Sequence, residues 1–266
     1  MSGPIVIFDS GIGGLSIFDE IKKVLPDQGY CYLFDNARLP YGELEESVLI
    51  KGCVDLICEQ VKRIDAVLVV VACNSASTLV LPGLRARLSI PIVGVVPAIK
   101  PAAQISKTRH IGLLATHGTI KRSYTRELIK EFAGDCKVDL FGSSELVMLA
   151  EAKLAGEKLD LIKLESQLKP IQHSDLDTLV LGCTHFPIIA DEIQQVLGAG
   201  VKLLDSGKAI AQRVSYLLEN IEDKLDNSAG ELMAIYTTEE ITPGLATRLA
   251  EKGFTTIASR SSANLD

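Results

Sequence analysis

The sequence predicts an α/β fold with mostly parallel sheets, arranged as two pseudo-symmetric α/β domains. Short apolar runs rich in valine, isoleucine and leucine show little alternation, which is typical of strands covered on both faces. Amphipathic segments with helical periodicity lie between these runs. A pattern found in the first half of the chain also returns in the second half.

The expected elements follow one another along the chain. The strands are expected at residues 5–9, 30–34, 66–72, 92–96, 110–115, 137–141, 178–182, 201–204, 232–236 and 255–258. Amphipathic helices are expected at 15–25, where Pro26 follows as a stop, and at 47–64, 122–132, 144–154, 188–197 and 208–218. Residues 216–230 include the polar run EDKLDNSAG and are expected to form a loop before a last β-α-β unit.

Two pairs of segments indicate an internal duplication. IVIFDSG at 5–11 is echoed by IGLLATHG at 111–118, and VLVVVACNS at 67–75 is echoed by DTLVLGCTH at 177–185. Any two buried strands resemble each other, but here a cysteine followed by polar residues recurs at the matching end. The pattern therefore predicts two related α/β halves.

Composition restricts the class of protein. The chain has 266 residues, 47% hydrophobic and 23% charged, which is enough to bury the core of one large domain or two modest ones. A net charge of −7 argues against a nucleic-acid binder, and the one dense basic stretch, 121–126, is expected to be a solvated helix face. No apolar run is long enough to span a bilayer, and the N-terminal segment lacks the basic region of a signal peptide. A cytoplasmic location is expected.

The six cysteines are expected to be free thiols, because the cytoplasm is reducing. No CxxC pair or histidine-rich tract is present, so a zinc site is not expected. Four of the cysteines are interpreted as small buried hydrophobic residues, namely Cys31, Cys53, Cys58 and Cys136. Cys73 and Cys183 differ from them, because each ends an apolar strand and is followed directly by polar residues.

Polar clusters stand at several predicted strand ends, where open α/β sheets bind their ligands. They are Asp9-Ser10-Gly11, Cys73-Asn74-Ser75, Cys183-Thr184-His185 and Asp205-Ser206-Gly207, with Pro40-Tyr41-Gly42 in the loop after the second strand. A helix N-terminus near a cysteine favours its thiolate. Asp9 is expected either to cap a helix or to act as a base, and His185 either to tune Cys183 or to cap the next helix.

The stretch DSGIGGLS at 9–16 places glycines at a strand-to-helix turn. It does not match the dinucleotide fingerprint G-x-G-x-x-G, and no Walker A sequence occurs in the chain. The glycines are interpreted as residues of a tight turn that needs positive φ.

Two thiols that face one cleft allow three kinds of chemistry. One thiol could be a covalent nucleophile with His185 as its base, or the two could form a redox disulfide, although they lack the usual CxxC spacing. Alternatively, one thiolate removes a proton from a carbon centre while the other thiol delivers a proton to the opposite face. The third kind agrees best with the duplication, because a reversible racemase needs an acid and a base that exchange roles.

The motifs resemble those of the glutamate racemase family, the cofactor-independent part of the aspartate/glutamate racemase superfamily. The matching segments are DSGIGG (9–14), LPYG (39–42), ACNSAS (72–77), GVVPAIKPA (94–102), IGLLAT followed by GTI (111–120) and GCTHFP (182–187). The resemblance spans most of the chain and weakens after about residue 220. Ser75 departs from the family pattern, in which threonine is common, but it keeps the hydroxyl group.

The resemblance implies a two-domain α/β enzyme whose active site lies in the cleft between the domains. Residues 1–97 and 208–266 would form a discontinuous first domain, and residues 98–207 an inserted second one. Cys73 would act on the D-enantiomer with the help of Asp9, and Cys183 on the L-enantiomer with the help of His185. Glu151 matches an acidic residue near the family's site. The implied substrate-binding residues are Asp9, Ser10, Pro40, Tyr41, Gly42, Asn74, Ser75, Thr184 and His185.

The implied reaction is the interconversion of L- and D-glutamate, which supplies D-glutamate for bacterial peptidoglycan. The resemblance implies no cofactor, a small-molecule substrate as the partner, and a homodimer. The cysteine spacing, the net charge and the short apolar runs predict no metal, no nucleic-acid partner and no membrane association. Three alternatives remain open. The first is another enzyme of the same superfamily, either a racemase for aspartate or another amino acid, or a decarboxylase. The second is a two-lobed small-ligand binding protein with structural cysteines. The third is a thiol redox protein.

Overall fold

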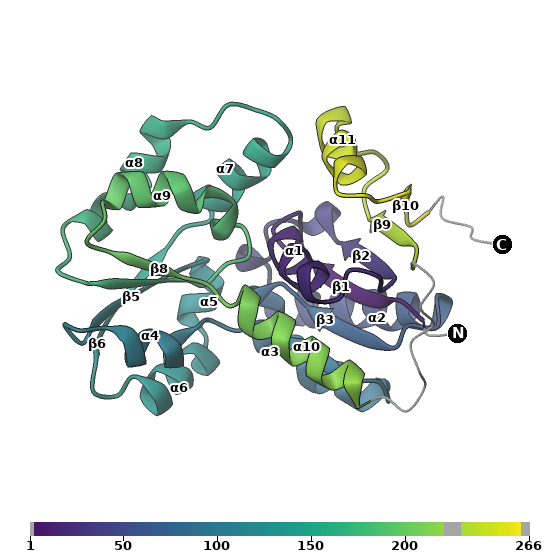
Figure 1. The fold of residues 1–266 in the computed structure, drawn as a ribbon, viewed down its shortest axis with the longest axis horizontal. Helices are drawn as coiled ribbons and strands as arrows, with labels where there is room; N and C mark the ends of the chain where they lie inside the picture. Colours follow the sequence, from purple (N-terminus) through teal and green to yellow (C-terminus); the bar gives the residue numbers. More distant parts are fainter. Residues whose placement is uncertain (1–2, 221–229, 262–266) are drawn as a thin grey trace.

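Two sheets, each covered by helices on both faces, organise the chain (Figure 1). The computed structural model describes residues 3–220 and 230–261. We call the six-stranded sheet and its helices the first lobe, and the four-stranded sheet and its helices the second lobe. Among the described residues, no helix is both long enough and apolar enough to cross a membrane.

The first sheet has the strand order β10-β9-β2-β1-β3-β4, and all of its neighbouring strands are parallel. Its strands are β1 (Ile5–Asp9), β2 (Tyr30–Phe34), β3 (Leu68–Val71), β4 (Ile92–Gly94), β9 (Leu232–Tyr236) and β10 (Thr256–Ser259). The second sheet has the order β6-β5-β7-β8 and is also parallel. Its strands are β5 (His110–Ala115), β6 (Lys137–Gly142), β7 (Thr178–Leu181) and β8 (Lys202–Leu204).

The strand orders confirm the predicted duplication. The series β2-β1-β3-β4 in the first sheet has the same order as β6-β5-β7-β8 in the second. The two segments that echo each other therefore occupy equivalent central strands, β1 with β5 and β3 with β7. The first sheet differs by the added pair β9 and β10, which follow β2 on one edge.

Helices cover both sheets. Those of the first lobe are α1 (Leu15–Val24), α2 (Glu46–Arg63), α3 (Asn74–Arg87), α10 (Gly207–Glu219) and α11 (Pro243–Glu251). Those of the second lobe are α4 (Ile99–Ile105), α5 (His117–Lys121), α6 (Ser123–Phe132), α7 (Glu145–Leu154), α8 (Leu161–Gln172) and α9 (Ala190–Leu197). Short 3₁₀ turns are η1 (Asn36–Arg38), η2 (Tyr41–Glu43) and η3 (Phe186–Ile189).

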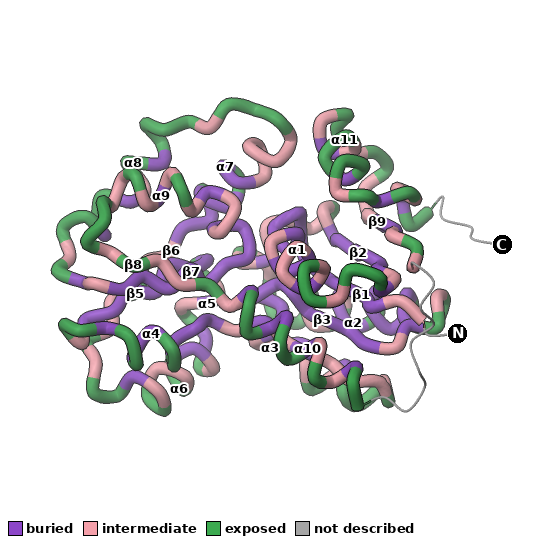
Figure 2. Tube along the Cα trace, in the orientation of Figure 1, coloured by how far each residue is buried: buried purple, intermediate pink, exposed green. Residues whose placement is uncertain are grey.

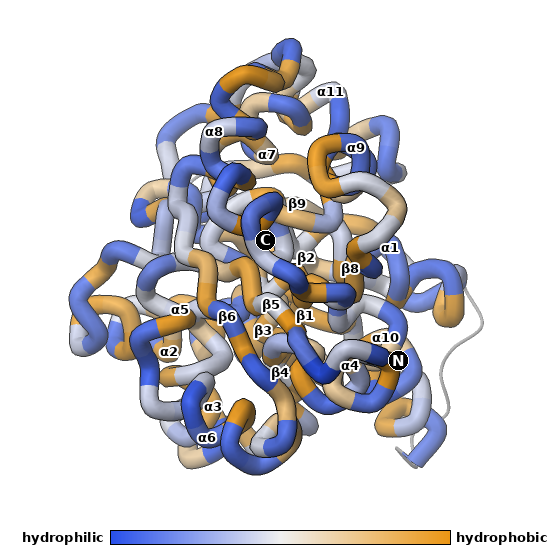
Figure 3. Tube along the Cα trace, turned by 90° about the vertical axis from the view of Figure 1, so that its left-hand side faces the viewer, coloured by the Kyte–Doolittle hydropathy of each residue, from blue (hydrophilic) through white to orange (hydrophobic). Residues whose placement is uncertain are grey.

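The central strands are buried on both faces, as their unbroken apolar runs predict. In β1, Ile5 and Ile7 pack on the face covered by α1 and α10, whereas Val6 and Phe8 pack on the face covered by α2 and α3. Figure 2 shows these strands as buried segments between helices with exposed outer faces. Figure 3 shows the same division by hydropathy, with polar segments on the outside of the molecule.

All ten predicted strands and all six predicted helices are confirmed, with small differences at their ends. Three expectations about burial and the ends of elements were wrong. Cys136, interpreted as a buried residue, is only partly buried. Helix α10 continues to Glu219, into the segment that was expected to be a loop, and residues 221–229 of that segment lie outside the described residues. The basic stretch 121–126 is not simply a solvated face, because Arg122 is only 8% exposed.

Candidate active site

Strand ends from both sheets meet at one small cavity between the lobes. Its volume is about 10 Å³. It is lined by Asp9, Ser10, Leu39, Pro40, Tyr41, Gly42, Cys73, Asn74, Ser75, Thr116, Val147, Cys183, Thr184 and His185. The cavity therefore contains every predicted catalytic and substrate-binding residue except Glu151, which lies directly behind His185. Asp205 and Ser206, from the fourth predicted strand-end cluster, line a neighbouring cavity instead.

Cys73 lies at the junction of β3 and α3, where it is the N-cap residue of the helix. Its Sγ atom is 3.7 Å from the Ser10 hydroxyl, and the thiol is 5% exposed. Burial and the nearby Asp9 carboxylate raise the pKa of Cys73 well above its usual value, although the Ala76 backbone N–H opposes this shift. The surroundings of Cys73 therefore favour the protonated thiol.

Asp9 ends β1 and is completely buried. Its carboxylate accepts hydrogen bonds from the Ser10 backbone N–H at 2.6 Å and from the Thr184 hydroxyl of the other lobe at 2.8 Å. Burial raises the pKa of Asp9, against the opposing effects of His185, Thr184 and Ser10. Gly14 is the N-cap residue of α1 and no side chain caps that helix, so Asp9 is not its cap.

Cys183 follows β7 in the second lobe and is 7% exposed. Its Sγ atom lies 3.6 Å from Nδ1 of His185, and Nε2 of the same imidazole lies 2.6 Å from Oε1 of Glu151. Burial opposes the imidazolium, but the bonds to Cys183 and Glu151 outweigh it and raise the pKa of His185 well above its usual value. The His185 side chain makes no cap hydrogen bond to η3, so the geometry favours its pairing with Cys183.

Glycines are required in the turn after β1 for a different reason from the one expected. Gly11 and Gly13 do not have positive φ, so the expected tight-turn conformation was wrong. A Cβ atom on Gly11 would lie 2.2 Å from Oε1 of Glu151, and one on Gly13 would lie 2.4 Å from Nδ1 of His185. These glycines allow the first lobe to approach the Glu151–His185 pair closely, and the Ile12 backbone N–H donates to Glu151 at 2.8 Å.

Three hydroxyl groups form a second contact between the lobes. Ser75 Oγ lies 3.0 Å from Thr116 Oγ1 and 3.1 Å from Thr119 Oγ1. Both threonines belong to the segment that matched the family motif at 111–120, but neither was predicted as a site residue. Leu39 and Val147 were missed as well, because apolar residues of this type usually indicate a core.

The lobes are closed over the cavity. A volume of about 10 Å³ holds at most one water molecule, so an amino acid can enter only if the lining groups move. The contacts that hold the lobes together here include Asp9 with Thr184, Glu151 with Ile12, and the Ser16 hydroxyl with the Thr184 carbonyl at 2.9 Å. A closed site of this kind excludes water from the reacting groups.

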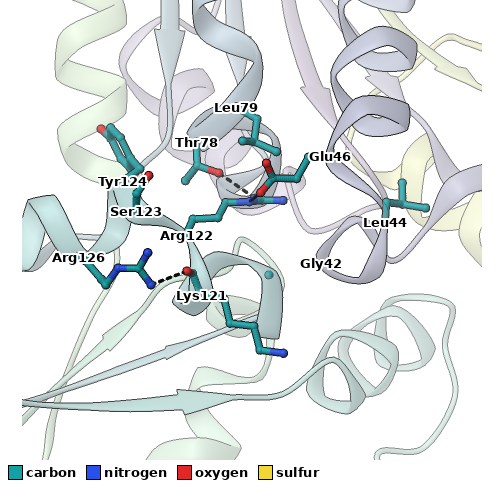
Figure 4. Close-up of a pocket in the computed structure, with 11 residues that line it drawn as sticks. Gly42, Leu44, Glu46, Thr78, Leu79, Lys121, Arg122, Ser123, Tyr124 and Arg126 are labelled. Atoms are coloured by element: carbon teal, nitrogen blue, oxygen red, sulfur yellow. Dashed lines mark hydrogen bonds and ion pairs between the residues drawn. The ribbon is translucent and has the colours of Figure 1, made fainter.

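A larger pocket lies on another side of the interface between the lobes, with a volume of about 410 Å³. Figure 4 shows Arg122 pointing toward Thr78 and Glu46, while Arg126 donates to the carbonyl oxygen of Lys121. Arg122 also donates to the backbone carbonyl of Ser75, a residue of the small cavity. The guanidinium therefore connects the two pockets, a role that its place in a basic stretch did not indicate.

The fold and the cavity define a two-lobed α/β protein with two thiols at equivalent strand ends of one closed site. The sequence profile of the Asp/Glu/hydantoin racemase family matches residues 16–214. The chain is 79% identical to the glutamate racemase of Shewanella pealeana and 67% identical to that of Shewanella piezotolerans, each over the full length of both chains. The chain belongs to the Asp/Glu/hydantoin racemase family.

Solved structures give the same result. The structure of Escherichia coli glutamate racemase in complex with L-glutamate and the activator UDP-MurNAc-Ala has a TM-score of 0.90 and 47% identity, covering 97% of this chain and 98% of that one. Glutamate racemase RacE1 from Bacillus anthracis has a TM-score of 0.82 and 28% identity, covering 97% of each chain. Membership of the racemase family argues against the ligand-binding and thiol redox alternatives.

Proposed function

We propose that this chain interconverts L- and D-glutamate by proton transfer between the substrate and two cysteines, without a cofactor. The observation that carries the proposal is the placement of Cys73 and Cys183 at equivalent strand ends in one closed cavity. The full-length similarity to glutamate racemases supports glutamate as the substrate, in preference to aspartate or another amino acid.

The reaction begins with the α-carbon of glutamate between the two thiols. For L-glutamate, the Cys183 thiolate takes the α-proton, and the pair of electrons from the C–H bond remains on carbon. The Cys73 thiol then donates its proton to the opposite face, which yields D-glutamate, a Cys73 thiolate and a Cys183 thiol. D-glutamate follows the same steps in reverse, so both thiols serve as acid and as base.

The neighbouring charges support these roles. A protonated His185, held by Glu151, supplies the positive charge that stabilises a thiolate at Cys183. Burial and the nearby Asp9 carboxylate together raise the pKa of Cys73, which favours the protonated thiol in the empty site. Asp9 thereby assists Cys73, while His185 and Glu151 assist Cys183.

The polar groups of the cavity suit an amino acid with two carboxylates. Asn74 Oδ1 is buried and has no hydrogen-bond partner among the described residues, so it can accept from the substrate ammonium. The hydroxyls of Ser10, Ser75 and Thr184 can donate to carboxylates. Tyr41 and Gly42 also line the cavity, and their backbone N–H groups are proposed to donate to a substrate carboxylate. Donors fixed in this way stabilise the negative charge that develops during proton removal.

The wider role follows from the activity. We propose that the D-glutamate is used for bacterial peptidoglycan and that the enzyme works in the cytoplasm. The domains are proposed to be residues 1–97 with 208–266, and residues 98–207, in agreement with the division of the strands between the two sheets. A homodimer is also proposed.

Proton NMR of the purified protein with L-glutamate in deuterated buffer tests the activity, with a reductant and without added cofactor. We expect the α-proton signal to disappear from the proton spectrum, while circular dichroism of the same sample shows D-glutamate rising to the level of L-glutamate. Exchange with aspartate alone would replace glutamate as the substrate. No exchange with any amino acid would reject racemisation altogether.

We further propose that the 410 Å³ pocket binds an anionic activator of the kind present in the Escherichia coli structure. The pocket is lined by Lys121, Arg122 and Arg126, which suit phosphate groups, and by the aromatic ring of Tyr124. Arg122 reaches from this pocket to the carbonyl of Ser75, so a ligand there can act on the catalytic cavity.

The test is the racemisation rate with and without UDP-MurNAc-Ala. We expect the activator to raise the rate of the wild type and to have a reduced effect on a Lys121→Ala/Arg126→Ala variant. Lys202→Ala, in β8 of the second lobe, is the matched control and should respond as the wild type does. No response of the wild type, or an unchanged response of the double variant, would contradict this second proposal.

A further inference from the structure

Asp35 is a buried carboxylate that the proposed reaction does not use. It follows β2 at the carboxyl end of the first sheet, and its side chain is only 2% exposed. Its backbone N–H donates to the carbonyl of Asp9 at 3.0 Å, which fixes Asp35 beside the catalytic strand end. A buried carboxylate in this position requires partners, because an ionised group is costly to bury without them.

The partners of Asp35 come from three segments. Oδ2 accepts a hydrogen bond from the Tyr41 hydroxyl and forms an ion pair with Arg38. Oδ1 accepts from the Thr237 hydroxyl at 2.8 Å. Asp35 therefore joins the turn η1, the loop that carries Tyr41 and the segment after β9.

The position of the Arg38 guanidinium in this cluster depends on Gly52 and on the Tyr41 ring. It lies over Gly52 of α2, where a Cβ atom would be 1.4 Å from Nη1 of Arg38. It also lies 6.0 Å from the centre of the Tyr41 ring. The absent side chain at position 52 leaves the space that the counter-charge of Asp35 occupies.

The phenol of Tyr41 is directed into this cluster. The ring packs in the core of the first lobe, and Cys53 Sγ lies 3.7 Å from the hydroxyl oxygen. Burial and the neighbouring Cys53 and Asp35 raise the pKa of Tyr41 well above its usual value, so the phenol keeps its proton and donates to Asp35. Tyr41 can therefore offer the substrate its main chain, whereas its hydroxyl is already engaged.

We propose that Asp35 is a positioning residue for substrate binding, which acts by holding the Tyr41 phenol and so fixing the Pro40–Gly42 main chain at the cavity wall. This inference rests on the proposed function, because the N–H groups of Tyr41 and Gly42 are its substrate contacts. Arg38 and Gly52 support the position of Asp35 by supplying its counter-charge and the space for it.

The experiment compares KM and kcat for L-glutamate in Asp35→Asn, Tyr41→Phe and the double variant. Each single substitution weakens the Asp35–Tyr41 bond without changing the volume of the core appreciably. Loss of an interaction that is equal in the ground state and the transition state raises KM and leaves kcat unchanged. We expect KM to rise about tenfold in each single variant, with kcat within about threefold of the wild type. The double variant should be no worse than the worse single one, because both act through the same bond.

Asp177→Asn is the matched control. Asp177 accepts hydrogen bonds from Ser106, Lys107 and Thr108 at the far end of the second sheet, so its variant should lose stability without a change in KM. An unchanged KM in Asp35→Asn, a loss of kcat alone, or multiplied effects in the double variant would overturn the inference. If Asp35→Asn does not fold, Tyr41→Phe decides, since an unchanged KM in that variant also overturns it. A wild type without racemase activity would instead reject the proposed function.

Discussion

Cys73 and Cys183 occupy equivalent places in two sheets of the same strand order, but their neighbours differ in charge. Both thiols are almost equally buried, at 5% and 7% exposed. Cys73 has the carboxyl group of Asp9 nearby, whereas Cys183 has the imidazole of His185 at 3.6 Å. The second position after each cysteine holds the clearest difference, since it is Ser75 in the first lobe and His185 in the second.

The difference indicates which protonation state the empty site adopts. Burial and Asp9 raise the pKa of Cys73, and the bonds to Cys183 and Glu151 raise that of His185 despite its burial. The resting site is therefore expected to hold a neutral thiol at Cys73 and an imidazolium beside Cys183. From this state, Cys183 is expected to take the α-proton of L-glutamate, and the Cys73 thiol to donate a proton to the opposite face of the α-carbon.

Steady-state rates cannot reveal this asymmetry directly. Enantiomers have equal free energies in solution, so the equilibrium constant of racemisation is one and kcat/KM must be the same in both directions. The difference between the thiols has to be measured on each thiol separately.

The largest effect is expected from removal of either thiol. Cys73→Ala and Cys183→Ala should each reduce racemisation by about 10²–10⁴-fold or more, because each lacks one of two essential proton carriers. The remaining thiol can still exchange the α-proton of one enantiomer with solvent. In deuterated buffer, Cys183→Ala should exchange only D-glutamate, and Cys73→Ala only L-glutamate.

The same proton NMR measurement contains its own control, because each variant is tested with both enantiomers. Full activity of either variant in both directions would refute the two-thiol scheme. Exchange of the same enantiomer by both variants would refute the assignment of one face to each cysteine.

A smaller effect is expected from removal of the imidazolium. His185→Asn should reduce racemisation by about 10²-fold, the lower end of the range for an acid–base group. In the wild type near pH 7, iodoacetamide should modify Cys183 faster than Cys73, because the thiolate is the nucleophile. The variant should lose this difference, as measured by mass spectrometry of the two cysteine peptides. Equal rates for the two thiols in the wild type would contradict the comparison.

Much of the fold could be predicted because its strands are buried on both faces and appear as continuous apolar runs. The helices were harder. Helix α3 contains Pro82 followed by Gly83, a pair that usually indicates a turn, and α8 contains Pro170. Tertiary packing overrides these local signals, since Val80 and Leu84 of α3 are fully buried against the first sheet.

The candidate site could be predicted where a strand end carries a reactive group. Asp9, Cys73 and Cys183 belong to this class, because parallel strands direct their carboxyl ends to one edge. Thr119, Arg122 and Asp35 could not be predicted in the same way. Threonine, arginine and aspartate are common residues, and their place in the site depends on contacts between segments far apart in the sequence.

The substitution Glu151→Gln tests whether Glu151 stabilises the imidazolium of His185, because that effect makes the stability of the protein depend on pH. The pKa of His185 is raised in the folded state, so its stabilisation is complete below the unfolded pKa of about 6.5 and is lost as the pH rises through the folded pKa. The variant removes one cause of that shift. Near pH 6 its free energy of unfolding should therefore be about 1.5–3 kcal/mol lower than that of the wild type, which lowers the melting temperature by several degrees. Both differences should become smaller at higher pH.

Thermal unfolding of both proteins between about pH 6 and pH 9 provides the measurement. Glu192→Gln is the control, because Glu192 of α9 forms its ion pair with Lys153 of α7, the helix that also carries Glu151. A constant difference between Glu151→Gln and the wild type at all pH values would show that Glu151 does not act through His185.

The smallest effect is expected at Ser75, the position that corresponds to His185. Ser75→Thr keeps the hydroxyl that contacts Thr116 and Thr119, and the added methyl group requires only a small adjustment, so kcat/KM should stay within about twofold of the wild type. Ser75→Ala leaves two buried hydroxyls with one partner fewer and should cost about tenfold. The comparison between the two variants separates the hydroxyl from the size of the side chain. If Ser75→Thr costs as much as Ser75→Ala, the Cys73 side of the site depends on close packing, and its difference from the Cys183 side is steric as well as electrostatic.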